Sequence, residues 1–251
     1  MTKGEKVIDS INSVEDTKGN NGDKGNLIIS NLRLIWFGEK DVKVNLSIGF
    51  DCILNTEIQE TNSLSRGRAQ ALYLRTRFNG SHFQFIFTSL VKQSPRLFTS
   101  FLAVTRAYES TKTYRDLKLR CAIVQDKNLK LLPLEQVYNK YNGVWNLSAE
   151  QGNLGSFFVT NVRLVWFANV AENFNVSVPW IQISEIAVRE SKFGTAMAIR
   201  TLKQSGDYTL GFKMENIENV FQEIVNLHKV YIDSPIFGVE AQMEEEAKTL
   251  D

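Results

Sequence analysis

The chain contains a long internal repeat, which constrains its fold more than any other feature of the sequence. Residues 25–37 read GNLIISNLRLIWF and residues 155–167 read GSFFVTNVRLVWF, at an offset of 130. Across residues 5–60 and 135–190, 15 of the 56 aligned pairs are identical. A period this long predicts two copies of a whole domain rather than a solenoid of short units. The length of 251 residues suits two compact domains.

Each copy shows a series of short apolar runs bounded by turn residues, which predicts β-strands. In the first copy Asn79-Gly80 is typical of a hairpin turn, and the longest run is expected to bend at Ser30-Asn31 into two antiparallel strands. The predicted strands of the first copy are 6–14, 26–37 (the bent run), 44–48, 53–58, 71–78 and 82–87. Those of the second copy are 136–145, 156–167, 173–178, 183–188, 196–201 and 208–212.

One amphipathic helix closes each copy. Ser94-Pro95 opens the first, with an apolar stripe that begins at Leu97, and Asn216 opens the second, with a stripe that begins at Val220. The predicted fold class is therefore mainly β: two tandem pleckstrin-homology-like barrels, each of antiparallel strands capped by a C-terminal α-helix. The predicted ranges are 1–120, 121–232, and 233–251 for a C-terminal extension with a disordered acidic tail.

The two copies differ at their starts. Residues 121–133, with a strand-like stretch at 129–132, precede Glu135 in the second copy, whereas four residues precede the matching Glu5. Either the first barrel lacks an N-terminal strand that its twin has, or the chain starts inside a longer protein. A missing strand leaves an open sheet edge that needs a partner.

The composition argues against several functional classes. Two cysteines and two histidines, without clustered carboxylates at ligand spacing, predict neither a disulfide framework nor a metal site. We find no nucleophile–base pair and no phosphate loop, so we expect neither an enzyme nor a cofactor. The strands lack interleaved basic and aromatic residues and the pI is about 7.7, so we expect no nucleic-acid partner.

Several longer motifs resemble the Bardet–Biedl syndrome 5 family, over essentially the whole chain. They are DTKGNNGDKG (16–25), SPRLFTS (94–100), YRDLKLR (114–120), NGVWNL (142–147), EQGNLG (150–155) and SPIFG (234–238). The resemblance implies two pleckstrin-homology-like domains, phosphoinositide binding and no enzymatic activity. It also implies membership of the BBSome, a coat-like complex that moves membrane proteins into and out of cilia. The implied locations are the cytoplasm, the ciliary membrane and the basal body.

Net charge separates the two halves. Residues 1–120 carry 18 basic and 12 acidic side chains, and residues 121–251 carry 11 and 16, so the first half is the better candidate for an anionic surface. A phosphoinositide site needs basic side chains and backbone N–H groups around clustered phosphates. The predicted lipid-binding residues lie in inter-strand loops of the first copy: Lys18, Lys24, Lys40, Lys43, Arg66 and Arg68. The alternative for each is an ordinary solvated loop charge.

A second set of residues recurs in both copies, although only the first loop is basic. A role in the fold, such as pairing with a carboxylate, therefore explains this repeat signature better than ligand binding. Its members are Asn31, Arg33 and Trp36, and Asn161, Arg163 and Trp166.

The function that the family resemblance implies is a non-catalytic adaptor within the BBSome, with other BBSome subunits and a phosphoinositide-containing membrane as partners. The alternative is a stand-alone phosphoinositide-binding module or interaction scaffold outside a coat complex.

Overall fold

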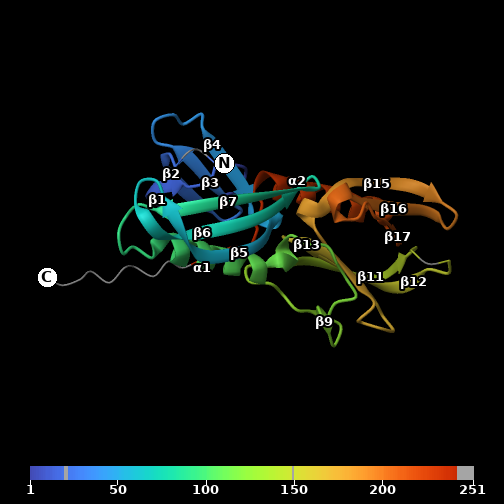
Figure 1. Cartoon of the computed structure of the whole chain (residues 1–251). Coiled ribbons are helices and arrows are strands. Elements are labelled where there is room, and N and C mark those ends of the chain that lie inside the picture. Colours follow the sequence, from blue (N-terminus) through green and yellow to red (C-terminus); the bar gives the residue numbers. More distant parts are fainter. Residues whose placement is uncertain (20–21, 149, 242–251) are drawn as a thin grey trace. The chain divides into compact units, whose positions relative to one another are not determined.

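The computed structural model describes residues 1–19, 22–148 and 150–241, which form two compact units (Figure 1). The first unit comprises residues 1–110 with the described residues after Gly238, and the second comprises Thr111–Gly238. Each contains one large antiparallel sheet and one long helix. The prediction of a mainly β chain with two helix-capped domains is confirmed. The predicted acidic tail, residues 242–251, lies outside the described residues.

The first unit contains seven strands in the order β4-β3-β2-β1-β7-β6-β5. The short 3-10 helix η1 (Phe50–Cys52) joins β4 to β5, and α1 (Arg96–Ser110) follows β7. The strands are β1 (Val7–Asp16), β2 (Lys24–Ser30), β3 (Arg33–Gly38), β4 (Asn45–Gly49), β5 (Ile53–Ser63), β6 (Gly67–Phe78) and β7 (Ser81–Ser89). The bend predicted at Ser30-Asn31 separates β2 from β3.

The second unit repeats this order as β14-β13-β12-β11-β17-β16-β15 and adds β8 beside β14. Its main strands are β11 (Val137–Asn146), β12 (Asn153–Thr160), β13 (Arg163–Ala168), β14 (Asn175–Pro179), β15 (Ile183–Ser191), β16 (Gly194–Thr201) and β17 (Thr209–Lys213). The short elements are η2 (Lys112–Tyr114), β8 (Lys118–Leu119), β9 (Val124–Gln125), β10 (Asn128–Leu129), η3 (Trp180–Gln182) and η4 (Lys203–Ser205), and α2 (Ile217–Asp233) closes the unit.

The apolar stripe of each helix packs on its own sheet. Leu97, Phe101 and Val104 of α1 are buried, and α1 contacts β1 and β2. In α2 the buried residues include Val220 and Ile224, against β15, β16 and η3. Burial of such stripes stabilises each unit by removing large aliphatic and aromatic side chains from water.

Gly25 and Gly155, the first residues of the repeated motif, occupy positions that leave no room for a side chain. A Cβ on Gly25 would lie 2.4 Å from the carbonyl oxygen of Phe37, and a Cβ on Gly155 would lie 2.1 Å from that of Phe167. The indole rings of Trp36 and Trp166 approach the same positions to 2.5 and 2.7 Å. Any side chain there would force the β2–β3 or β12–β13 pair apart.

The stretch predicted as an extra strand at 129–132 is not one, which corrects the sequence prediction. The additional strand of the second sheet is β8, and residues 128–129 belong to a separate short hairpin, β9–β10. The reason is that nearby backbone groups bind side chains. The Lys130 carbonyl accepts a hydrogen bond from Arg163, and the Leu132 N–H donates one to Glu135.

Candidate functional site

The residues of the repeat signature lie at the β2–β3 turn and its counterpart, where they connect the start of each domain to its sheet. The Asn31 side chain accepts from the Lys6 N–H at 2.9 Å and donates to the Gly4 carbonyl. Asn161 makes the same two bonds with Gln136 and Leu134. These contacts satisfy backbone groups that the turn leaves free, which is a role in the fold.

The signature arginines pair with carboxylates in both domains. Arg33 Nε lies 2.8 Å from Glu5 Oε1, and Arg163 Nε lies 2.7 Å from Glu135 Oε1. The hydrogen bonds from Arg33 hold the pKa of Glu5 at about 2, although burial opposes this shift.

The signature tryptophans are core residues. Their indole N–H groups donate to the carbonyls of Val14 and Val144 at 2.9 and 3.0 Å, and both rings are almost fully buried.

Of the six predicted basic residues, four bind groups of the protein itself, and one of these, Lys18, is described below. Lys24 pairs with Glu39 at 3.0 Å and Arg68 with Glu60 at 2.5 Å. Arg66 donates to the Ser89 carbonyl at 2.7 Å. Lys40 and Lys43 are exposed in the β3–β4 loop. The structure therefore does not bring the six together into one cluster.

Lys18 lies elsewhere, beside β6 and β7, whose residues the predicted lipid site did not include. Its Nζ donates to Gln84 Oε1 on β7 at 2.7 Å, and Gln84 pairs across the strands with Arg75 on β6. Arg75 in turn pairs in register with Asn55 on β5. A row of polar and cationic side chains thus crosses three strands and ends at the β1–β2 loop.

A hollow of about 600 Å³ lies along this row, and we call it the Arg75 hollow. It is lined by Lys18, Leu54, Asn55, Arg75, Thr76, His82, Phe83 and Gln84. Arg77 faces His82 across the hairpin and is exposed on the same side of β6 as Arg75. The nearest recorded carboxylate of Arg75 is Glu57, with Oε1 3.8 Å from Nη2, so solvent and ligands reach most of this guanidinium.

Large apolar side chains are exposed around the same end of the sheet. Leu54 is 59%, Phe78 58% and Phe83 47% exposed. Cationic side chains beside exposed aromatic side chains suit contact with a partner that has anionic groups at its surface and apolar material beneath them.

Sequence reasoning missed Arg75, Arg77 and His82 because it searched loops for cations and treated these residues as strand. The available signal was the alternation of Arg75 and Arg77 on one face, next to the hairpin that carries His82.

The second domain has a matching hollow of about 350 Å³, lined by Ser184, Glu185, Arg200, Thr201, Leu202, Lys203 and Asp207. A smaller hollow of about 90 Å³ shares Glu185 and Arg200 with it and is also lined by Ala187, Arg189, Ala198 and Thr209. We call the two together the Arg200 hollow. The strand register makes Arg200 the counterpart of Arg75. Arg200 precedes Thr201, which pairs with Ile183. Arg75 likewise precedes Thr76, which pairs with Ile53.

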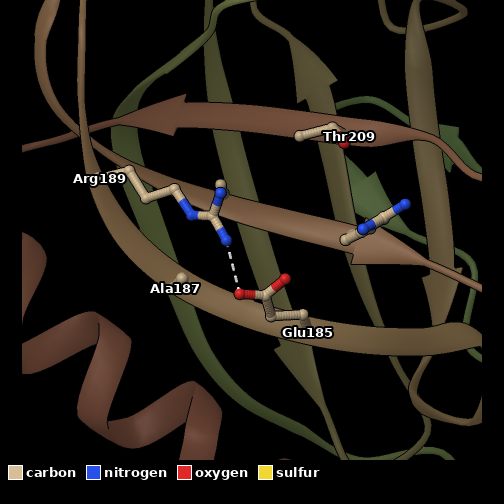
Figure 2. A pocket seen from close by; sticks show the side chains of 6 residues that line it. Glu185, Ala187, Arg189 and Thr209 are labelled. Carbon is tan, nitrogen blue, oxygen red and sulfur yellow. Dashed lines mark hydrogen bonds and ion pairs between the residues drawn. The ribbon is translucent and has the colours of Figure 1, made fainter.

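Carboxylates pair with both arginines of the Arg200 hollow. Arg189 pairs with Glu185 at 2.6 Å, and Arg200 with Asp207 at 3.0 Å; the first of these pairs is drawn in Figure 2. The hydrogen bonds that Arg200 donates to Asp207 raise the pKa of Arg200 and lower that of Asp207. The residue at the Lys18 position is Ser148. The cationic hollow is therefore a property of the first domain and not of the shared fold.

In the described residues, no helix is both long and apolar enough to cross a membrane.

The sheet order, the closing helices and the two hollows define a class of protein: a tandem of pleckstrin-homology-like domains. The family model for the Bardet-Biedl syndrome 5 protein N-terminal PH-like domain matches residues 5–110, and the model for the second PH-like domain of the same protein matches residues 118–241.

Curated relatives agree with these models. BBSome complex member BBS5 of Xenopus laevis is 56% identical over 254 residues, covering 100% of this chain and 70% of that protein. The Homo sapiens protein of the same name is 55% identical over 99% of this chain and 74% of its own length. The Caenorhabditis elegans BBSome complex member bbs-5 is 42% identical over 95% of this chain and 69% of its own. The chain belongs to the Bardet–Biedl syndrome 5 protein family.

Proposed function

We propose that this chain is a non-catalytic subunit of a BBSome coat complex and serves as an adaptor in ciliary membrane-protein trafficking. The support is that relatives 55–56% identical over 99–100% of this chain bear the name BBSome complex member. Its partners are then the other BBSome subunits, and its locations are the cytoplasm, the ciliary membrane and the basal body.

We further propose that the first domain binds a phosphoinositide-containing membrane surface through the Arg75 hollow. The observation that carries this proposal is the contrast between the two domains: Lys18 and Arg75 line one hollow, whereas Arg200 at the matching position is paired with Asp207. Phosphate groups bind guanidinium and ammonium groups strongly, and the Glu57 carboxylate, at 3.8 Å, competes for Arg75 less than Asp207, at 3.0 Å, competes for Arg200. The exposed Phe78 and Phe83 then lie where acyl chains begin.

A vesicle sedimentation assay tests the lipid proposal. The full chain is mixed with phosphatidylcholine vesicles that contain or lack a few per cent of a phosphatidylinositol bisphosphate. We expect Arg75→Glu and Lys18→Glu each to weaken binding to the phosphoinositide vesicles several-fold, because each reverses a charge beside the phosphates. Arg200→Glu is the matched control and should leave binding unchanged.

Two results would overturn this site. Equal losses for Arg75→Glu and Arg200→Glu would mean that net charge alone drives binding. Loss with Lys40→Glu/Lys43→Glu, and none with Arg75→Glu, would place the lipid at the β3–β4 loop instead.

Co-purification tests the assembly proposal separately. The tagged full chain expressed in ciliated cells should recover the other coat subunits in a constant ratio, and Arg75→Glu should not change that recovery. A chain that binds vesicles but elutes alone at its monomer mass would support the stand-alone lipid module and reject the coat subunit.

A further inference from the structure

The outer face of β12, β13 and β14 in the second domain is covered by residues 118–134 of the same chain. β8 pairs with β14, joining Lys118 to Ser177 and Leu119 to Val176. Beyond β8 the segment forms a small apolar cluster with the sheet, in which Val124, Ile123 and Leu129 pack on Phe158, Val165 and Phe167. This segment therefore supplies both an edge strand and a lid of aliphatic side chains.

The first domain has the same face, made by β2, β3 and β4, and we call it the β2–β4 face. The repeat offset equates Ile28, Ile35 and Phe37 with Phe158, Val165 and Phe167. In the described part of the chain, the ladder ends at β4 on this side of the first sheet.

Burial differs at each pair of matching positions. Phe158, Val165 and Phe167 are 5%, 0% and 1% exposed, whereas Ile28, Ile35 and Phe37 are only half-buried. Ser177 is fully buried, and its counterpart Ser47 is exposed. The two faces have equivalent strands, so the difference comes from what lies on top of them. In the second domain this is residues 118–134 together with Lys140 of β11, whose Nζ lies 4.9 Å from the centre of the Phe158 ring and whose counterpart is Ser10.

Polar groups show the same contrast. In the second domain the Arg163 guanidinium donates to the Lys130 carbonyl of the covering segment, and its side chain is 0% exposed. The Arg33 side chain remains 29% exposed. At the edge, both asparagines donate to a carbonyl of their own loop, Asn45 to Val42 and Asn175 to Glu172. Asn175 also bonds the N–H and the carbonyl of Cys121 in the covering segment, whereas Asn45 donates again within its loop, to Lys43.

We propose that the β2–β4 face is a docking surface for an extended polypeptide segment with the chemistry of residues 118–134. Such a segment pairs antiparallel with β4, places aliphatic side chains over Ile28, Ile35 and Phe37, and offers a backbone carbonyl to Arg33. Strand addition at a sheet edge obtains its affinity from backbone hydrogen bonds and its selectivity from alternate side chains. A lipid would leave the amides of β4 without partners, so the surface selects polypeptide.

A synthetic peptide of this chain's own residues 116–132 tests the proposal on the full-length protein. The second domain already holds its copy of this segment, so the β2–β4 face is the expected place of binding. We expect saturable binding of the fluorescein-labelled peptide by anisotropy, with slower hydrogen exchange at residues 45–49. A scrambled peptide should not bind.

Ile35→Lys should weaken peptide binding at least about tenfold, because it replaces a buried aliphatic contact with a charge. Ile58→Lys is the matched control: Ile58 is an exposed isoleucine on β5 of the same domain, and its replacement should not change binding. Circular dichroism and the Tm show whether each variant folds, and Phe37→Ser serves as a second variant if Ile35→Lys does not.

Three results of the peptide experiments would overturn the proposal. They are no peptide binding at the solubility limit, binding that Ile35→Lys and Phe37→Ser leave unchanged, and exchange protection at 175–179 instead of 45–49. Sedimentation that shows a dimer abolished by Ile35→Lys would identify a second copy of this chain as the occupant, and this result would also reject the proposal.

Discussion

Glu135 and Arg163 form an ion pair in which neither side chain is exposed to solvent, with Nε–Oε1 and Nη2–Oε2 distances of 2.7 and 2.9 Å. The matching pair of Glu5 and Arg33 has the same two hydrogen bonds, at 2.8 and 2.9 Å. Arg33 nevertheless remains 29% exposed. One chain thus contains the same ion pair in two solvent environments, which makes the effect of enclosure measurable.

Arg163→Ala should destabilise its domain by about 3–5 kcal/mol, because it leaves the Glu135 carboxylate buried and uncompensated. Arg33→Ala should cost less, about 1–3 kcal/mol, because the Arg33 side chain is 29% exposed and its removal lets water reach the enclosed Glu5 carboxylate. Urea unfolding followed by tryptophan fluorescence gives both free energies. Arg189→Ala, which breaks an exposed pair, should stay below about 1 kcal/mol. Equal losses at positions 33 and 163 would contradict the role of enclosure.

Acid should weaken the first domain through Glu5. The folded pKa of Glu5, about 2, lies below the ordinary value of 4.5, so the unfolded chain binds more protons between these values. The contribution of Glu5 is fully present above pH 4.5 and is lost as pH falls toward 2. The free energy of unfolding of Glu5→Gln should therefore be lower than that of the unaltered chain at pH 7, and the two should converge on acidification. A difference that stays constant down to pH 2.5 would contradict this linkage.

His228 should make the second domain sensitive to mild acid. It lies on α2 with its ring 6.0 Å from that of Trp180, and burial lowers its pKa from 6.5. The unfolded chain therefore takes up a proton first, and stability falls as pH drops through and below 6.5. His228→Gln should flatten the dependence of the second domain's free energy of unfolding on pH between 7.5 and 5. An unchanged slope would show that other groups govern this range.

Gly155→Ala should separate β12 from β13, because the new Cβ would lie 2.1 Å from the Phe167 carbonyl oxygen. Overpacking of this kind costs about 1–3 kcal/mol and sometimes more. Gly211→Ala is a suitable control, since its nearest neighbour would be Leu147 at 3.5 Å, an ordinary contact. Thermal unfolding should show a lower Tm for Gly155→Ala alone. Similar Tm values for the two variants would refute the steric explanation.

Most of the fold could be predicted because the repeat and the turn residues carry local information. The bend at Ser30-Asn31 and the helix after Pro95 follow from backbone preferences that act within a few residues. The strand predicted at 129–132 ends at Leu129, and beyond it the Lys130 carbonyl accepts a hydrogen bond from Arg163, a residue distant in the sequence. Propensity does not register contacts of that kind.

The candidate site was harder to predict than the fold. Lys18 could be found from its loop, but its neighbours Gln84 and Arg75 depend on the register of β5, β6 and β7. The ion pairs of Lys24 with Glu39 and of Arg68 with Glu60 could not be predicted from the sequence either, because the partners lie 15 and 8 residues away. Counting charges in loops therefore overstated the number of free cations.

The Asn-x-Arg element at the β2–β3 turn and at its counterpart fastens the start of each domain to its sheet. By the antiparallel order of the strands, the β1–β2 loop lies at the opposite end of the same hairpins. Sequence drift in that loop need not disturb the fastening. After a gene duplication that preserves the Asn-x-Arg residues, the surfaces of the two domains can therefore change independently. The first domain then carries a cationic hollow, and in the second the arginines of the hollow are paired with carboxylates.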